Sequence, residues 1–417
     1  MSAVAMRKEA PVDEAGAEID IDGARKRFAA GVNEVSEIMQ ERTDVVRSIR
    51  LSLLARCHGL LVGPPGEGKS RLLALFMILI NGSRFFKKLL GAFDTPDDLF
   101  GAPDLIELQK GSLVRKGAAL FSHIWLLDEY GRATTELRNM TNACLEEREY
   151  DQDGVQQKIN LITAWGASNS WPASEDDAAP LDRLAFRHFV GRLKMDESKK
   201  NVYKQSIGLG GPLVPSTLIT LEELRAMTCA TALVGHKDPK ATDAFIDNTM
   251  IPLENELAKA GIDISTRRRK LLLPIAQASA FVNGRDELSP LDLTPLANVL
   301  ANLPEQMKTV QEIVMKIASP VGFEVTEIVR TGEEAWTQAT KLIDASTGRV
   351  PDGTALMQIN HNMNSLRRRL KGMKKSHPEL SGDIEDALKR ISGDHIKVKR
   401  LLVEETTEKD DDDDADA

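Results

Sequence analysis

The chain has 417 residues, 42% hydrophobic and 28% charged, which is typical of a globular protein with about two or three domains. Its net charge of −9 argues against broad nucleic-acid binding, although Asp410 to Asp414 and Asp416 supply much of it near the end of the chain. The three cysteines form no C-x-x-C pair, no apolar run reaches about 18 residues, and the polar N-terminus resembles no secretory signal, so we expect a cytoplasmic protein without membrane spans.

The first half of the chain predicts an α/β fold. Residues 1–22 lack helical periodicity and are expected to form a flexible arm, and helical periodicity follows over 25–56. From about residue 60 to 194, short apolar runs alternate with helical stretches, as in a parallel sheet with helices on both faces. We therefore predict a nucleotide-binding domain over 23–200, with strand candidates at 60–62, 85–90, 123–127 and 159–167.

Two hairpins are expected to interrupt this domain. Residues 101–118 contain a pair of strand-like segments around Lys110-Gly111, where a helix would otherwise cover the sheet. The second hairpin covers 150–160 and turns at Asp151-Gln-Asp-Gly154.

The second half of the chain predicts helices. An all-α lid is expected over 201–305, and its helices are predicted at 221–233, 241–260, 267–282 and 291–303. Two further long helices, 306–345 and 355–403, predict a helical C-terminal extension over 306–403, broken near residues 347–353. The acidic segment 404–417 is expected to be disordered.

The strongest motif is G-x-x-x-x-G-K-S, which lies between a short apolar strand and an apolar helix. This loop wraps backbone N–H groups around nucleotide phosphates, and the helix that follows adds its positive N-terminal end. Lys69 would supply charge to the β and γ phosphates, and Ser70 a hydroxyl for Mg²⁺. The predicted nucleotide-binding residues are Gly63, Pro64, Pro65, Gly66, Glu67, Gly68, Lys69, Ser70 and Arg71.

A buried strand that ends in Asp128-Glu129 is the partner a P-loop requires. Asp128 would hold Mg²⁺ through water together with Ser70, while Glu129 would polarise the attacking water, so hydrolysis of ATP is the expected outcome. Asn169 ends another apolar run, where an amide either orients the lytic water or only forms a turn.

Arginines near the end of the α/β region are candidates for stabilising the transition state. Arg183 or Arg187 would act on the γ phosphate only if it reached the nucleotide, often from a neighbouring subunit; a solvated arginine is the alternative. The run Thr-Arg-Arg-Arg-Lys at 266–270 begins a lid helix, where it either binds phosphate or forms a solvated surface.

These motifs together resemble the MoxR family of AAA+ ATPases, closest to its RavA branch. The resemblance spans about residues 33–300 and fades beyond about 305. It rests on GPPGEGKS, TPDDLFG (95–101), LLDEYGRA (126–133), LEER (145–148), GASN (166–169), LDRLAFR (181–187) and STRRRKLLLPIAQASAFVNGR (265–285).

The resemblance implies a role for each motif residue. Lys69 and Ser70 would be the Walker A residues, Asp128 and Glu129 Walker B, and Asn169 sensor 1. Arg183 would be the arginine finger that acts on a neighbour's ATP. Leu184 stands where the family often has Phe, so Arg187 remains a rival.

The resemblance also assigns the lid arginines and the hairpins. Arg267 would be the sensor 2 arginine, with Arg268 as runner-up. Residues 101–118 would be the helix-2 insert, and 150–160 the pre-sensor-1 insert.

The resemblance implies a Mg²⁺-dependent ATP hydrolase that forms a homo-oligomeric ring, expected to be a hexamer. It would remodel a protein client in a chaperone-like way, in some cases with a von Willebrand factor A domain partner. The client is not selected by any residue in the sequence.

The alternative is a DNA- or RNA-stimulated motor of the same clade, in which the basic residues of the insert and of a later helix would be the contacts. The acidic charge and the scarcity of aromatic residues near them argue against it, and the basic helix is also interpretable as a solvated face. A third class is a scaffold that binds ATP and turns over slowly, against which Glu129 argues. The motor's contacts would be Lys110, Arg115 and Lys116, Arg367 to Arg369, Lys371, Lys374 and Lys375.

Overall fold

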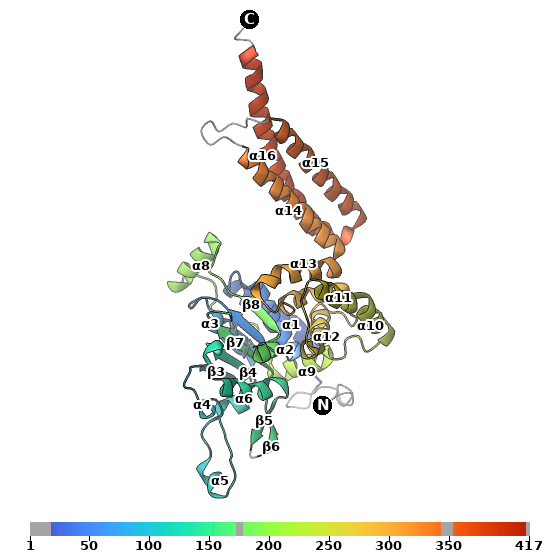
Figure 1. Ribbon diagram of the computed structural model, residues 1–417. Helices are drawn as coiled ribbons and strands as arrows, with labels where there is room; N and C mark the ends of the chain where they lie inside the picture. Colours follow the sequence, from blue (N-terminus) through green and yellow to red (C-terminus); the bar gives the residue numbers. More distant parts are fainter. Residues whose placement is uncertain (1–17, 153, 172–177, 343–352, 414–417) are drawn as a thin grey trace. The chain divides into compact units, whose positions relative to one another are not determined.

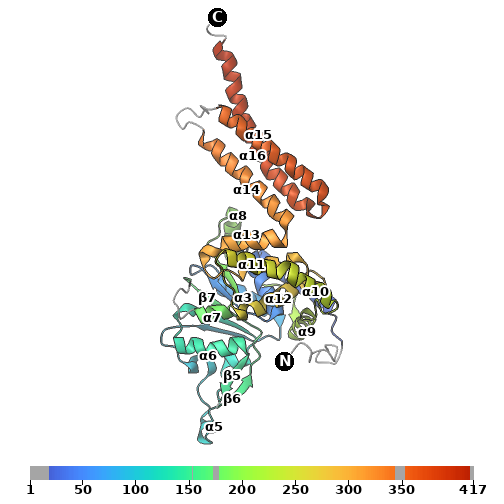
Figure 2. The same ribbon diagram turned by 45° about the vertical axis from the view of Figure 1, so that its right-hand side comes forward.

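The computed structural model describes residues 18–152, 154–171, 178–342 and 353–413. The chain forms two compact units, of which the first ends at Val314 and the second begins at Met315. Figures 1 and 2 show the elements of each unit. The predicted extension was expected to begin at residue 306.

The first unit is built on a parallel sheet of five strands in the order β3-β4-β7-β1-β8. Every neighbouring pair runs parallel, so all five strands end at the same edge of the sheet. The predicted α/β class is therefore confirmed. The strands are β1 (Gly59–Val62), β3 (Phe85–Leu89), β4 (Ile124–Asp128), β7 (Thr163–Ser168) and β8 (Phe186–Phe189).

Two details of the predicted sheet were wrong. A strand was expected over 159–167, but β7 begins only at Thr163. Residues 159–162 instead connect β6 to β7. The edge strand β8 was not predicted. Its sequence, Phe-Arg-His-Phe, contains no apolar run, although Phe186 is fully buried and stacks on Trp165 with ring centroids 6.3 Å apart.

Helices cover both faces of the sheet (Figure 1). The first begins at Ile21, inside the expected flexible arm, because the Asp20 side chain accepts a hydrogen bond from the Gly23 N–H and caps the helix. Residues 1–17 of that arm lie outside the described residues. The helices of this part are α1 (Ile21–Ile38), α2 (Thr43–Ala55), α3 (Lys69–Leu79), α6 (Thr135–Glu146), α7 (Ala178–Arg183) and α8 (Asp196–Ser206).

The first insert is not the strand hairpin that we expected. After α4 (Pro96–Phe100), the outgoing segment forms a short helix, α5 (Leu105–Gln109), because Asp104 accepts hydrogen bonds from the N–H groups of its first turn. The chain then turns at Gly111 and returns, with one antiparallel bridge between Pro103 and Arg115. The second insert is a two-stranded antiparallel hairpin as predicted, formed by β5 (Glu149–Gln152) and β6 (Val155–Lys158).

The lid consists of helices that follow a small parallel pair, β2 (Ile80–Asn81) with β9 (Ile219–Thr220). The predicted helix at 241–260 is continuous but contains a π-turn, η5 (Ile246–Met250), between its two α-helical parts. The predicted helix at 291–303 is instead a 3₁₀ helix, η6 (Pro290–Asn298), with Pro295 inside it. The remaining elements are α9 (Leu221–Thr231), α10 (Pro239–Phe245), α11 (Ile251–Lys259), α12 (Thr266–Val282), η7 (Pro304–Gln306) and α13 (Met307–Ala318).

The C-terminal helices are more divided than the two we expected. The first predicted helix breaks at Ser319-Pro320 and the second at His377-Pro378, because the residue before a proline avoids the helical conformation. Helix α16 includes residues 404–413 of the predicted disordered tail, a stretch that contains good helix formers such as Glu and Lys; residues 414–417 lie outside the description. The helices are α14 (Pro320–Lys341), α15 (Gly353–Ser376), η8 (Pro378–Leu380) and α16 (Ser381–Asp413).

Candidate active site

The predicted Walker residues and the predicted sensor 1 residue, Asn169, meet at the edge where the parallel strands end. The P-loop follows Val62 of β1, Asp128 is the last residue of β4, and Asn169 follows Ser168 of β7. The Ser70 hydroxyl donates a hydrogen bond to the Asp128 carboxylate over 3.0 Å.

Asn169 connects this cluster to the other two charged groups. Its side-chain oxygen accepts a hydrogen bond from the Lys69 ammonium over 3.3 Å, and its amide N–H donates to the Glu129 carboxylate. The side chain thus contacts two charged residues of the site, which a mere turn former would not do.

The P-loop backbone is shaped to receive an anion. Gly66 and Gly68 have φ angles of 84° and 80°, a region that favours glycine. At Gly63 an added Cβ would lie 2.1 Å from the Val190 carbonyl oxygen, so only glycine fits. Helix α3 begins at Lys69, directly after the loop, and its free N–H groups and dipole favour a phosphate at this position.

The Lys69 ammonium is anchored over the loop. It donates hydrogen bonds to the carbonyl oxygens of Gly63, at 2.5 Å, and Pro64, at 2.9 Å. Burial lowers the pKa of Lys69, while the nearby Asp128, Glu129 and Glu67 carboxylates oppose the shift. The ammonium is therefore held where it can move onto a phosphate.

The donors at this edge fit Mg²⁺. The Ser70 hydroxyl and the Asp128 carboxylate are hard oxygen donors that face each other, and Mg²⁺ is usually held by one or two such groups with waters and substrate phosphates. In the described part of the chain, no group of three or more His, Cys, Asp or Glu side chains could hold a metal by itself. A magnesium ion here would thus depend on the nucleotide for its remaining ligands.

Glu129 adopts an unusual backbone conformation. Its φ of 56° lies in the left-handed region that a glutamate rarely visits, and such strain is frequent at functional sites. The turn carries its carboxylate to Asn169, which directly follows the neighbouring strand β7. The Glu129 carboxylate is thus held between the Asn169 amide and Arg132, which it contacts at 3.3 Å.

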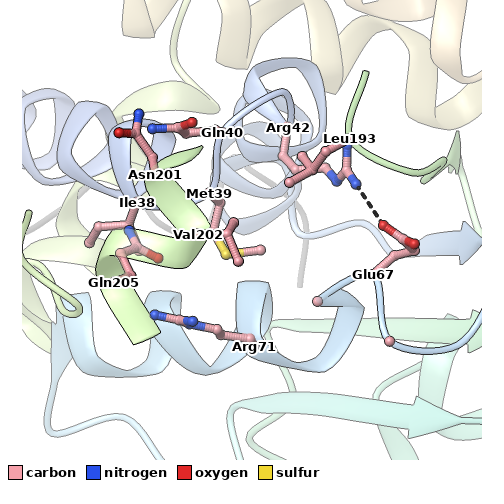
Figure 3. A pocket seen from close by; sticks show the side chains of 12 residues that line it. Ile38, Met39, Gln40, Arg42, Glu67, Arg71, Leu193, Asn201, Val202 and Gln205 are labelled. Carbon is pink, nitrogen blue, oxygen red and sulfur yellow. Dashed lines mark hydrogen bonds and ion pairs between the residues drawn. The ribbon is translucent and has the colours of Figure 1, made fainter. Parts of the chain in front are cut away.

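A pocket beside the P-loop offers room for the nucleoside (Figure 3). Its walls combine apolar side chains with the amides of Gln40, Asn201 and Gln205, a composition that suits a heterocyclic base. Arg42 forms one side, where it contacts Glu67 of the P-loop over 3.4 Å. The lining residues are Ile38, Met39, Gln40, Arg42, Gly66, Glu67, Gly68, Arg71, Leu193, Asn201, Val202 and Gln205.

Sequence reasoning found only the P-loop part of this pocket. The end of α1, the segment after β8 and helix α8 all contribute, and more than a hundred residues of chain separate the end of α1 from the other two. None of these segments carries a motif that would have marked it.

The predicted arginines lie at the opposite end of the strands, where the strands of the sheet begin. Arg183 lies three residues before the start of β8, and Phe186 of β8 pairs with Gly59, where β1 begins. Glu146, the partner of Arg183 at 2.9 Å, follows Leu145, whose carbonyl accepts a hydrogen bond from His58 just before β1. The P-loop follows the other end of β1, and four strand residues span about 13 Å.

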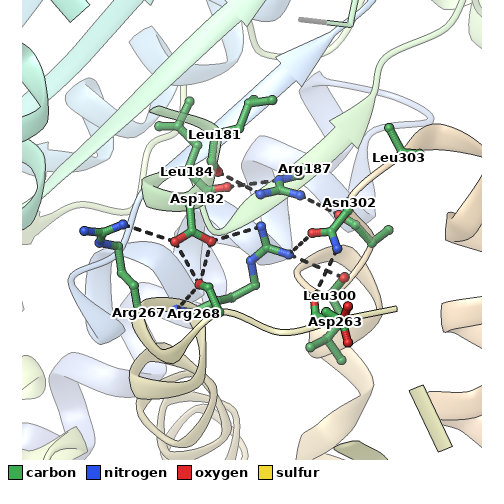
Figure 4. A network of polar contacts seen from close by, with 12 residues as sticks. Leu181, Asp182, Leu184, Arg187, Asp263, Arg267, Arg268, Leu300, Asn302 and Leu303 are labelled. Carbon is green, nitrogen blue, oxygen red and sulfur yellow. Dashed lines mark hydrogen bonds and ion pairs between the residues drawn. The ribbon is translucent and has the colours of Figure 1, made fainter. Parts of the chain in front are cut away.

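Arg267 joins the same cluster from the first turn of α12. Its side chain contacts Glu146 at 2.8 Å and Asp182 at 3.2 Å. Asp182 also accepts hydrogen bonds from the hydroxyl of Ser265, the N-cap of α12, at 2.7 and 2.8 Å. The lid helix is thereby tied to the residue that precedes Arg183 (Figure 4).

Arg187 and Arg268, the alternatives to Arg183 and Arg267, make their contacts within the protomer. Arg187 is only 2% exposed and donates to the carbonyl oxygens of Leu181, Leu184 and Ala301. Arg268 is also buried, where it contacts Asp182 and Asn302 (Figure 4). Arg187 is therefore wrongly placed for a finger that must leave its own subunit.

Comparisons with known proteins agree with this geometry. Residues 26–210 match a family model described as the MoxR domain in the MoxR-vWA-beta-propeller ternary systems, and residues 245–314 match an AAA lid domain. The chain belongs to the MoxR family of AAA+ ATPases. The resemblance drawn from the motifs is thus confirmed at the level of the family, whereas the RavA branch stays a prediction.

Individual relatives of this MoxR-family chain carry no assigned activity. It is similar to two uncharacterized proteins of Methanocaldococcus jannaschii. One is 27% identical over 379 residues, covering 88% of this chain and 98% of the relative; the other is 28% identical over 300 residues, covering 70% and 75%.

A solved structure supports the fold. The crystal structure of a "putative ATPase" from Cytophaga hutchinsonii matches with a TM-score of 0.56 at 17% identity, over 71% of this chain and 96% of that one. At this identity the likeness supports the AAA+ fold of the MoxR-family chain and not a particular activity. Among the helices of the described ranges, none is long and apolar enough to cross a membrane.

Proposed function

We propose that this MoxR-family chain is a ring-forming ATPase that hydrolyses ATP at its subunit interfaces and uses the energy to remodel a protein client. One observation carries the proposal. The Walker residues lie at the edge where the strands end, whereas Arg183 lies at the edge where they begin. Because the four residues of β1 that separate these ends span about 13 Å, we take Arg183 to act on the triphosphate of a neighbouring protomer.

The chemistry at the P-loop follows from the contacts. Lys69 and the loop N–H groups would hold the phosphates, and Ser70 and Asp128 would hold Mg²⁺, which neutralises phosphate charge when bound. Glu129 would take a proton from the attacking water, with its carboxylate held by Asn169. This base argues against a scaffold that only binds ATP.

The neighbour would complete the reaction. A guanidinium stabilises the charge that builds up on the transferred phosphoryl group, and it needs to come from outside when the chain's own arginine is too far away. Arg183 is 15% exposed and Arg267 36%, so both side chains have a solvent-facing part that a second protomer could meet. Repetition of this head-to-tail contact closes a ring, with a hexamer as the expected size.

The first insert supports a protein client over a nucleic acid. Its helix α5 presents Leu105 and Ile106, which are 73% and 65% exposed. Its basic residues are neutralised, because Lys110 contacts Glu107 at 3.0 Å and Lys116 contacts Asp104 at 2.8 Å. Arg115 likewise pairs with Asp97.

Three of the basic residues of the later helix are also engaged in contacts within the chain. Arg369 contacts Glu324 at 2.7 Å, and Lys374 pairs with Glu385. Arg367 donates to Ser392 at 3.0 Å. A partner with a von Willebrand factor A domain is the other expectation, and it is supported by the three-component systems named in the matched family model.

The test is the turnover of Arg183→Ala. Because an arginine finger contributes about 10³–10⁵ in kcat, we expect ATPase activity to fall by at least a hundredfold while binding of a fluorescent ATP analogue is retained. Parent protein should also lose turnover per chain on dilution, when the ring dissociates. Full activity of the variant, or of an isolated protomer, would refute the proposal.

A further inference from the structure

Glu146 at the end of α6 is shared by the two arginines. Its Oε2 is 2.9 Å from an Nη of Arg183, and its Oε1 is 2.8 Å from Nε of Arg267. Each carboxylate oxygen thus serves one guanidinium. The arginines come from elements far apart in the sequence, α7 and the lid helix α12, and Glu146 is where they meet.

The arrangement has a physical reason. Two guanidinium groups that approach one phosphate repel each other, and a carboxylate between them removes much of that repulsion. Hydrogen bonds from Arg267 lower the pKa of Glu146, with further lowering by the charge of Arg183, so the carboxylate is ionised at neutral pH. A planar guanidinium bound to one carboxylate oxygen is also fixed in direction.

We propose that Glu146 is a positioning residue that holds Arg183 and Arg267 as a pair directed at the triphosphate of the neighbouring protomer. The inference rests on the proposed function, because it requires a neighbour's nucleotide as the target. Glu146 itself does not touch the reacting atoms. Its role is to set the spacing of the two cations before the neighbour arrives.

The neighbouring residue provides a matched control. Glu147 is exposed and has the same charge, and within the described residues its side chain forms no hydrogen bond or ion pair like those of Glu146. Glu146→Gln keeps the size of the side chain but removes its charge. Because misplacing catalytic groups by about 1 Å can cost about a hundredfold in rate, we expect Glu146→Gln to lose about ten- to a hundredfold in kcat. KM for ATP should change less than about twofold, since the P-loop is untouched.

Glu146→Asp is a second variant that retains the charge. The shorter side chain can reach only one of the two arginines, so we expect turnover between those of the parent and of Glu146→Gln. Glu147→Gln should behave like the parent. A melting temperature close to that of the parent would show that the variants fold.

A mixing experiment separates action on the neighbour from action within the protomer. Glu129→Gln has a defective base but intact arginines, whereas Glu146→Gln has an intact base but a misplaced pair. In mixed rings, a Glu146→Gln protomer beside a Glu129→Gln protomer would receive correctly placed arginines. We therefore expect the mixture to turn over ATP faster than the sum of its separate components.

The same mixture with Arg183→Ala distinguishes the two proposals. If Arg183→Ala is complemented by Glu129→Gln but Glu146→Gln is not, the role of Glu146 is refuted and the proposed function stands. If neither variant is complemented, the neighbour's arginine is not used and both proposals fail. Parent-like kcat in Glu146→Gln would overturn the inference about Glu146 on its own.

Discussion

Replacing Arg187 with methionine should destabilise the protein without removing a catalytic group. The guanidinium is almost fully buried, and it donates to the carbonyl oxygens of Ala301 at 2.5 Å, Leu181 at 2.7 Å and Leu184 at 3.3 Å. These contacts join helix α7, strand β8 and the segment that follows η6 in the lid. Arg187→Met fills a similar volume but removes the donor to the carbonyl oxygens of Leu184 and Ala301, whereas the Leu181 carbonyl keeps its hydrogen bond from the Leu184 N–H.

The size of the effect follows from two opposing contributions. Each unsatisfied buried acceptor costs about 1–3 kcal/mol. Against this, burial lowers the pKa of Arg187 to about 9, which means that holding the charged form inside the protein is itself unfavourable, and methionine removes that cost. We expect a net loss of about 2–4 kcal/mol in the free energy of unfolding.

The assay is urea denaturation of Arg187→Met beside Arg183→Met. Arg183 contacts a half-exposed carboxylate, so its replacement should cost less than about 1 kcal/mol while turnover falls steeply. Arg187→Met should show the reverse, with lower stability and residual turnover in the folded fraction. A stable Arg187→Met protein that fails to turn over ATP would refute this reasoning and restore Arg187 as the finger.

Three further predictions test other parts of the molecule. Glu34→Gln should lose about 1 kcal/mol of stability at neutral pH, because hydrogen bonds from Thr217 and Ser216 lower the pKa of Glu34 to about 2 in the folded protein. The parent protein should lose this stabilisation as the pH falls from 4.5 towards 2, whereas the variant should not. Urea unfolding of both proteins at pH 7 and at pH 3 would measure the difference. Gly63→Ala should abolish binding of a fluorescent ATP analogue, because its Cβ would strike Val190, whereas the same change at Gly191, where the Cβ has open space, should not. Ile106→Ser should weaken binding of an unfolded model protein, measured by fluorescence anisotropy, and leave basal ATPase activity intact; parent-like binding would argue against the insert as a client contact.

The parts of the site that could be predicted are those with local signatures. The P-loop and the strand ending in Asp128 are contiguous motifs, and parallel strands bring their ends to one edge regardless of the rest of the fold. Asn169 was found for the same reason, although the motif left its role open and the contacts with Lys69 and Glu129 are what distinguish it from a turn former.

The features that could not be predicted depend on tertiary contacts. Strand β8 carries Arg187 and His188, and their burial is possible only because other segments supply hydrogen bonds or stacking partners such as Trp165. Segment 105–109 was expected to be a strand, but it forms a helix because the Asp104 side chain caps its first turn. The pocket beside the P-loop collects residues from four separate segments, none of which is unusual by itself.

The pairing of the basic side chains of the first insert with carboxylates affects how a bound polypeptide could be recovered. With Lys110, Lys116 and Arg115 each matched by a carboxylate, the grip of this insert on another polypeptide would come from aliphatic side chains instead of long-range attraction. Such binding should persist in a high-salt wash and be reversed by a mild non-ionic detergent. Elution with detergent is therefore the suitable way to recover a polypeptide bound to the insert.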